Sequence, residues 1–482
     1  MSEPISAAPA STNPSPRYPE GFRARRGLNW TVVGFLYTTF YMCRYNLPIA
    51  NKAISDELGF SKGDMGWIIS TNMWAYAVGQ IVNGLLADKL GGKRTMLIGA
   101  AGTVVMNLLF GVASFWGLLG FFIAIRGIDG YLQSFGSPGF IKINVSWFNK
   151  RERGQFAGIY GFMINLGRFI INQIGPALMA GSAVFGMIHM PQVHWRWLFW
   201  VPSIVAAIVA LTLYFTVKDT PEQAGYHVDD LKEAEPEREP ASARAPAPER
   251  EPGILDVLVK IGTNPVIWVV GMAYSCTGTV RHSLDHWYIR YFQEWHGVQI
   301  NDWVIVWLGF LIPFMASAGS LTAGIVSDKL FKGSRAPVAA GIYFIETVII
   351  LFAAQFAGLG KEIAVIFVVL MAFTVNSTHS IMGVAAAMDI GGKKMAGFAA
   401  GLINSFQYLG GALAGVVLGK LLDGTGVPFR VFQWLGKLLT GTTPDQHMGW
   451  GIYFYFMAPF GALGCLLVFL ASRIARRRGV SL

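Results

Sequence analysis

The chain has 482 residues, of which 53% are hydrophobic and only 14% charged, and it contains 57 glycines. A soluble domain carries about a quarter charged residues, so this composition excludes an ordinary soluble protein and predicts a polytopic membrane protein. The formal net charge is +10, but the basic residues form short groups between apolar runs, which argues against nucleic-acid binding.

Residues 1–27 are rich in Pro and Ser and then basic, and they lack the apolar core of a signal peptide, so we expect a cytoplasmic N-terminal tail. The three cysteines, Cys43, Cys276 and Cys465, all fall inside apolar runs and form neither a disulfide framework nor a metal-binding pattern. Without a nucleotide-binding motif or a catalytic triad, we expect no enzyme activity, no metal and no other cofactor.

Twelve apolar runs are long enough to cross a bilayer as helices. They cover residues 28–50, 66–87, 95–115, 117–140, 155–178, 197–217, 265–290, 302–326, 336–358, 361–386, 395–421 and 450–472. The polar stretch 218–252, rich in Glu, Pro and Ala, divides them six and six and should be a flexible linker. The expected fold is all-α, with twelve transmembrane helices in two six-helix bundles around a central cavity, residues 28–217 and 253–472.

Lysines and arginines orient these spans, because short cytoplasmic loops carry the excess of both residues. Most basic residues lie in loops and tails on one and the same side of the predicted spans. These segments are residues 23–26, 89–94, 150–153, 329–335, 393–394 and the tail 473–482. Both termini and the linker are therefore predicted to be cytoplasmic. We expect a monomer in the lipid bilayer of a bacterial cytoplasmic membrane.

The first span contains an arginine far from either end. Arg44 lies 16 residues beyond Leu28, which places it ~24 Å along the helix. A charge at this depth costs at least ~2.5–3.5 kcal/mol, so Arg44 should face a polar cavity. Arg281 lies 16 residues beyond Pro265 in the seventh span and is its counterpart.

The two halves repeat one another. Gly84-Leu-Leu-Ala-Asp88-Lys89 closes the second span, and Gly324-Ile-Val-Ser-Asp328-Lys329 closes the eighth, each before a basic loop. Parallel repeats of this kind indicate a transporter whose site lies between the halves near the middle of the membrane.

Particular motifs narrow this interpretation. The segment from Gly84 to Arg94 resembles the loop motif of the major facilitator superfamily. The stretches 41–46, 133–138, 147–154 and 393–397, with Arg281 and Trp287, resemble the organophosphate:phosphate antiporters, which carry glycerol 3-phosphate, hexose phosphates and phosphoglycerates. The resemblance implies the major facilitator fold, a small organic anion and inorganic phosphate as partners, and phosphoryl binding by Arg44 and Arg281.

This sequence departs from that family at two positions. Gln80 stands where the glycerol- and hexose-phosphate carriers usually have a lysine, and Ile164 and Asn165 stand near a usual histidine. Both departures predict an altered pocket. Besides the two arginines, the candidate substrate-binding residues are Tyr41, Tyr45, Gln133, Asn165, Arg168, Tyr274, His379 and Tyr408.

Several of these residues have an alternative role. Arg281 can pair with Asp285 at i+4, and Arg168 either adds a third positive charge or pairs with Asp129. His282 and His286 share one helix face, and without a third ligand we favour pore lining over a metal site. Arg126 and Lys142 are expected to be structural.

The loop motifs should control conformation rather than bind substrate. The residues assigned to this role are Asp88, Lys89, Arg94, Asp328 and Lys329. The leading function is exchange of an organophosphate for inorganic phosphate by alternating access. One alternative is proton-coupled symport of organic anions, with Asp129, Asp285 or Glu346 carrying the proton. Another is a non-transporting sensor on the same fold.

Overall fold

The computed structural model describes residues 18–148, 153–184, 186–228, 262–331, 334–440 and 446–477. Most of the predicted N-terminal tail and of the linker, and half of the basic C-terminal tail, therefore lie outside the described residues. The first residues assigned to the linker are packed, since Val228 is buried and the ring of Tyr226 meets Phe22 at 5.6 Å.

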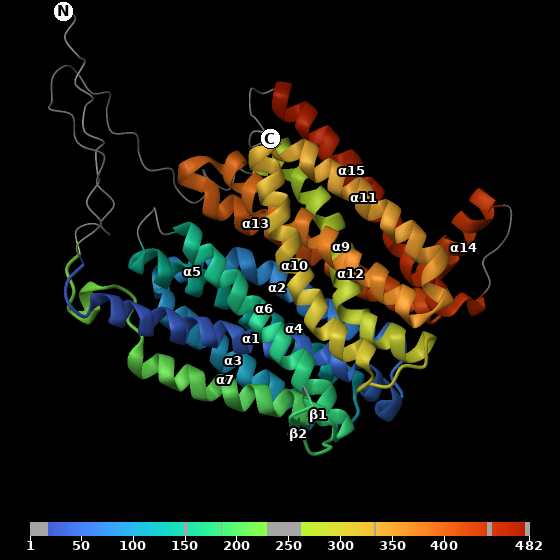
Figure 1. The fold of residues 1–482 in the computed structure, drawn as a ribbon, viewed down its shortest axis with the longest axis horizontal. Helices are drawn as coiled ribbons and strands as arrows, with labels where there is room; N and C mark the ends of the chain where they lie inside the picture. The colour runs from blue at the N-terminus through green and yellow to red at the C-terminus, as the bar shows by residue number, and fades with distance from the viewer. Residues whose placement is uncertain are drawn as a thin grey trace, which may run out of the picture.

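The first half consists of helices and one short hairpin. Its helices are α1 (Phe22–Leu58), α2 (Lys62–Leu90), α3 (Gly92–Ala113), α4 (Leu119–Gln133), α5 (Gly136–Trp147), α6 (Arg153–Ala180) and α7 (Trp197–Thr216). Between α6 and α7, strand β1 (Ala183–Val184) pairs antiparallel with β2 (Ile188–His189). In Figure 1 this half, coloured blue to green, lies against the yellow-to-red second half.

The second half repeats this arrangement and adds one short helix. Its helices are α9 (Pro265–Trp295), α10 (Trp303–Lys329), α11 (Arg335–Phe356), α12 (Lys361–Ser380), α13 (Ala386–Leu422), α14 (Gly426–Thr440) and α15 (Ile452–Arg477). Short 3-10 turns cover Glu222–Ala224, Ala357–Leu359 and Gln446–Gly451, and a π-helical segment covers Ile381–Ala385.

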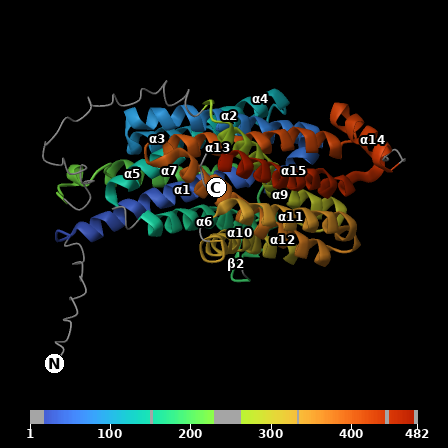
Figure 2. The ribbon, with the colours of Figure 1, turned by 90° about the horizontal axis from the view of Figure 1, so that it is seen from above.

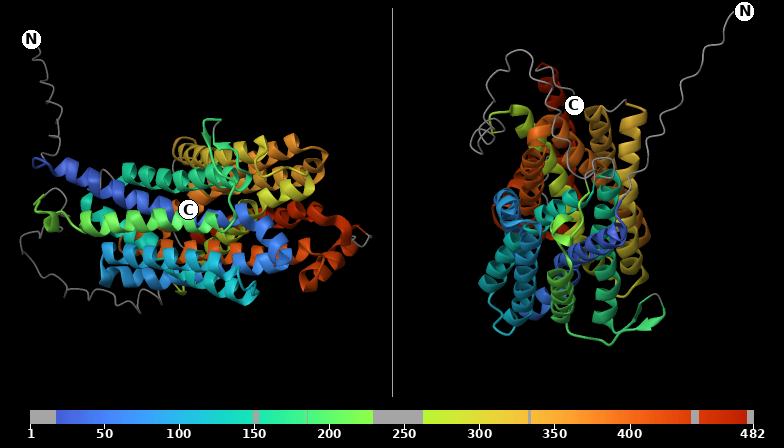
Figure 3. Two further views of the ribbon diagram at one scale, coloured as in Figure 1. Left: turned by 90° about the horizontal axis from the view of Figure 1, so that it is seen from below. Right: turned by 90° about the vertical axis from the view of Figure 1, so that its left-hand side faces the viewer.

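The all-helical polytopic fold agrees with the prediction, and three details differ. The fourth span is two helices, α4 and α5, because Pro138 cannot donate to residue 134 and its ring clashes with that carbonyl. The tenth and eleventh spans join through the π segment, so the predicted loop around residues 393–394 is helical. Helix α14, at the opposite end of the molecule from the start of α1, has no counterpart among the expected spans (Figure 3, left).

Composition alone identifies seven spans in the described part of the chain. They are α3, α7, α10, α11, α12, the second part of α13, and α15. Helices α1 and α9 fall outside this set because they carry buried polar side chains such as Arg44, Asn46, Asp285 and Arg290. In α1 and α9, the same buried polar side chains that lower the hydropathy belong to helices that line the interior.

The halves meet along three helix pairs, α1 with α9, α2 with α13 and α6 with α10. Helices α2 and α13 run side by side along the molecule (Figure 2). They approach closely because Gly66 faces the backbone of Gly415, where an added Cβ would lie 2.3 Å from the carbonyl oxygen. Nearby, the Ser70 hydroxyl donates to the Ala412 carbonyl at 2.5 Å.

Polar contacts join the halves at one end of the bundle, which we call the distal end and which is formed by residues 51–63, 290–294 and 423. The Asp423 carboxylate accepts hydrogen bonds from the Lys62 and Gly63 amides, at 3.0 and 2.6 Å. Lys62 Nζ also lies 3.1 Å from Glu294 Oε2. Arg290 donates to Asn51 Oδ1 and Ser55 Oγ, both at 2.9 Å.

Candidate functional site

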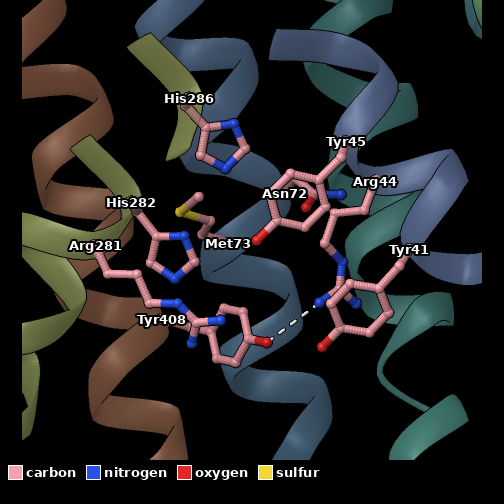
Figure 4. A pocket seen from close by; sticks show the side chains of 9 residues that line it. All are labelled: Tyr41, Arg44, Tyr45, Asn72, Met73, Arg281, His282, His286 and Tyr408. Atoms are coloured by element: carbon pink, nitrogen blue, oxygen red, sulfur yellow. Dashed lines mark hydrogen bonds between the residues drawn. The ribbon is translucent and has the colours of Figure 1, made fainter. Parts of the chain in front are cut away.

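A pocket lies between the halves and is lined by side chains from both. They are Tyr41, Arg44 and Tyr45 of α1, Asn72 and Met73 of α2, Arg281, His282 and His286 of α9, and Tyr408 of α13 (Figure 4). The two arginines that the sequence singles out therefore reach one pocket from opposite halves.

Arg44 is 8% exposed, and its hydrogen-bond partners among the described residues are uncharged. Its Nε donates to Gln133 Oε1 at 3.0 Å, and its Nη1 donates to the Tyr408 hydroxyl at 3.2 Å. The guanidinium also lies over the rings of Tyr41 and Tyr76, at 5.0 and 4.4 Å from their centroids. Cation–π contacts and neutral hydrogen bonds fix the direction of the group without cancelling its charge.

Arg281 is held by a second cluster in the other half. Its Nη1 lies 3.2 Å from His379 Nδ1, which also lies 2.5 Å from the Tyr274 hydroxyl and 3.1 Å from Gln407 Nε2. Asp285 Oδ2 lies 3.7 Å from Arg281 Nε, so the i+4 pairing is present at long range. His379 therefore contacts the arginine, Tyr274 contacts His379, and neither residue lines the pocket itself.

Arg168 has a partner that the sequence analysis did not assign to it. Its Nη2 lies 2.5 Å from Asp285 Oδ1, and the Tyr45 hydroxyl donates to Asp285 Oδ2 at 2.9 Å. This buried ion pair links α6 to α9 across the halves. The alternative of pairing with Asp129 is wrong, because Arg126, three residues before Asp129 on the same helix, holds that carboxylate at 2.8 Å.

The charges around the pocket do not balance. Among the described residues, the guanidinium groups of Arg44, Arg168 and Arg281 lie around one carboxylate, that of Asp285, which leaves two net positive charges. A phosphate monoester carries about −1.5 to −2 charges near pH 7. Arginine suits its oxygens because a planar fork donates two parallel hydrogen bonds. The site can therefore bind a dianion from both halves at once.

The other predicted residues lie around the pocket at different depths. Gln133 supports Arg44 from behind and also lies 3.2 Å from Asp129 Oδ1. Asn165 is not in the pocket lining, and its amide donates to Ser317 Oγ at 2.9 Å, which joins α6 to α10.

The loop-motif residues lie away from the pocket. Asp88 pairs with Lys142 of α5 at 2.8 Å, and Asp328 pairs with Arg335 of α11 at 2.8 Å. Lys89, Arg94 and Lys329 are exposed. Both ion pairs join helices of the same half, so the contacts that cross between halves are made by other residues.

Sequence reasoning missed Asn72 and Met73 and gave His282 and His286 only a general lining role. The available signals were the polarity of Asn72 within an apolar run and the one-turn spacing of the histidines. Neither signal identifies which helix face meets the other half.

Comparisons with known proteins agree with this architecture. Residues 33–415 match the family model of the Major Facilitator Superfamily. The chain is 28% identical to the membrane sensor protein UhpC of Salmonella typhimurium, with 83% of this chain and 84% of that protein covered. It is 26% identical to the glycerol-3-phosphate transporter of Bacillus subtilis, with 84% and 86% covered.

A solved structure is similar in fold. A bacterial homolog of the human lysosomal transporter Spinster, in an inward-facing and occupied conformation, superimposes with a TM-score of 0.70 at 16% identity. The match covers 94% of this chain and 98% of that one. At this identity the similarity concerns the fold alone.

Proposed function

Because this chain belongs to the Major Facilitator Superfamily, we propose that it exchanges an organophosphate for inorganic phosphate by alternating access. The organophosphate is a sugar phosphate, a glycerol phosphate, a phosphoglycerate or a phosphonate. The relation to a glycerol-3-phosphate transporter supports this class of substrate. Both termini are cytoplasmic in this proposal, on the basis of the basic loops.

One observation carries the proposal: Arg44 and Arg281 come from opposite halves and line the same pocket. An anion that bridges them draws the halves together, because each fork binds separate oxygens of one phosphoryl group. A ligand drives a conformational change only through its different affinity for the two states. Closure around the bridged anion supplies that difference.

Counterflow tests the proposal directly. The purified protein is reconstituted into liposomes loaded with inorganic phosphate, and uptake of labelled phosphate and of labelled glycerol 3-phosphate is measured with and without an imposed proton gradient. We expect uptake that requires internal phosphate and is unchanged by the gradient. Uptake into phosphate-free liposomes that follows the gradient contradicts antiport.

Proton-coupled symport is a second candidate, and Glu346 favours it. This residue of α11 is fully buried, and neither carboxylate oxygen has a hydrogen-bond partner among the described residues. A carboxylate in such surroundings is costly unless it carries a proton. Asp129 and Asp285 are each paired with an arginine and are weaker candidates. Gradient-driven uptake that Glu346→Gln abolishes identifies this mechanism.

A sensor is a third candidate, favoured by the relation to the membrane sensor protein UhpC. A sensor binds phosphate compounds without moving them. Binding of glycerol 3-phosphate in detergent, together with the absence of counterflow in liposomes, distinguishes it from both transport mechanisms.

A further inference from the structure

Two histidines face the pocket from α9, one helical turn apart (Figure 4). His282 and His286 are 6% and 4% exposed. Neither ring nitrogen of His282, nor Nδ1 of His286, has a hydrogen-bond partner in the described part of the chain. A buried polar atom without a partner costs ~1–3 kcal/mol. Three such atoms beside one cavity indicate a ligand that supplies their hydrogen bonds.

Ring stacking holds both imidazoles in place. The ring centroids of His282 and His286 lie 5.8 Å apart. His286 stacks on Tyr45 at 6.2 Å with an 8° interplanar angle, and His282 lies 5.5 Å from Tyr408. The rings meet their neighbours through their faces, which leaves the nitrogens at the ring edges for other contacts. The subsite is therefore rigid before a ligand arrives.

We propose that His282 and His286 form a second subsite, which binds hydroxyl groups on the organic part of the phosphate ester. This inference rests on the proposed function and names the residues that select its substrate. An imidazole can donate from one nitrogen and accept at the other, and a hydroxyl group also does both. No group of three or more possible metal ligands occurs among the described residues, so the spacing does not extend to a metal site.

The charge of the pocket favours hydroxyl over carboxylate in this position. The two net positive charges left by the three arginines and Asp285 are matched by the phosphoryl dianion alone. A carboxylate on the same ligand adds a third negative charge, which has no cation of its own in a buried site. Polyol phosphates should therefore bind better than phosphoglycerates.

The test uses the full chain in liposomes loaded with inorganic phosphate. The variants are His282→Phe and His286→Phe, which keep an aromatic ring for stacking, and His282→Gln and His286→Gln, which keep a donor and an acceptor. His189→Phe is the matched control, because His189 is exposed in β2. The measurements are half-saturation concentrations for glycerol 3-phosphate and glucose 6-phosphate, and the rate of phosphate–phosphate exchange.

We expect each Phe variant to raise the half-saturation concentration for both esters about tenfold, since one unmade buried hydrogen bond has about this effect. Phosphate–phosphate exchange should lose less than ester uptake does, because inorganic phosphate has no organic part to place at the second subsite. The Gln variants should recover much of the affinity. In the parental protein, 3-phosphoglycerate should compete more weakly than glycerol 3-phosphate.

Three results overturn the inference. If the Phe variants lose phosphate exchange and ester uptake equally, the histidines have only a structural role. If the half-saturation concentrations for the esters are unchanged, the histidines do not take part in substrate recognition. Competition by 3-phosphoglycerate as strong as that by glycerol 3-phosphate overturns the selection for hydroxyl groups. If the parental protein exchanges no phosphate, the proposed function itself is overturned, and this result is seen before any variant is compared.

Discussion

At the scale of single residues, the buried arginines differ in how their charges are compensated. The hydrogen bonds of Arg44 to described residues all go to uncharged groups, whereas Arg168 forms a direct ion pair with Asp285. A buried cation without a carboxylate is costly. The cost of burying Arg44 is therefore explained if its charge binds a ligand. Arg168, which is paired with a carboxylate, also stabilises the structure.

The first prediction concerns Arg44→Lys. An ammonium group keeps the charge but loses the two-pronged geometry and the contact with Gln133. Losing one charge-assisted hydrogen bond costs about 2 kcal/mol, so phosphate exchange in liposomes should fall roughly 30-fold. Arg473→Lys, at an exposed position of α15, should exchange normally. Near-parental exchange by the Arg44→Lys protein contradicts bidentate binding.

The second prediction concerns the ion pair between Arg168 and Asp285. Removing one partner leaves a buried charge, so Arg168→Gln and Asp285→Asn should each lower the free energy of unfolding by about 3–5 kcal/mol. The double variant removes both charges and should be more stable than either single variant. Thermal unfolding in detergent measures all three, and additive losses in the double variant show that the two groups act independently.

At the scale of helices, the distal end is closed by the start of α2 against the end of α13. The N-terminus of a helix carries unsatisfied N–H groups and a partial positive charge. Asp423, directly after α13, satisfies two of these groups in the other half. This contact must break when the distal end opens, so it stabilises the conformation seen here.

The third prediction follows from that contact. Asp423→Asn keeps the size of the side chain but loses its charge, so the distal end should open more often, by about tenfold if about 1.4 kcal/mol is lost. Spin labels at Asp56 and Val427, both exposed, report the distance across this end in a background without the native cysteines.

The control is Asp64→Asn, which changes the same helix terminus. The Asp64 carboxylate accepts a hydrogen bond from the Ser61 amide at 3.0 Å, within the same half. It should therefore leave the distance distribution unchanged. An equal shift in both variants means that Asp423 acts only by capping α2.

At the scale of the whole molecule, the proposed mechanism couples movement to binding through the site between the halves. The empty pocket carries two net positive charges, and closing it in a low dielectric is costly. Bound phosphate removes that cost, so the closed intermediate should form mainly when an anion is present.

The fourth prediction is that the protein exchanges but hardly leaks. Labelled phosphate should leave loaded liposomes at least about 100-fold faster into buffer that contains phosphate than into anion-free buffer at the same pH, since several kcal/mol oppose reorientation of the empty site. Liposomes without protein give the passive rate. Equal efflux into the two buffers contradicts this coupling.

Features that depend on one span or on the repeat could be predicted from the sequence. Apolar length predicted the spans, and the repeated loop motifs predicted two similar halves. The depth of Arg44 and Arg281 predicted that they face a polar cavity. Each of these inferences follows from distance along the chain and from the cost of burying charge, which need no knowledge of neighbouring helices.

Which side chains contact one another could be read only from the three-dimensional structure. The partner of Arg168 is 117 residues away on α9, and Asp423 reaches an amide 361 residues away. Such pairings depend on how one half rests on the other, and spacing within a helix carries no information about it. The partnerless nitrogens of His282 also depend on packing, because hydrogen-bond satisfaction belongs to the surroundings of a residue and not to its type.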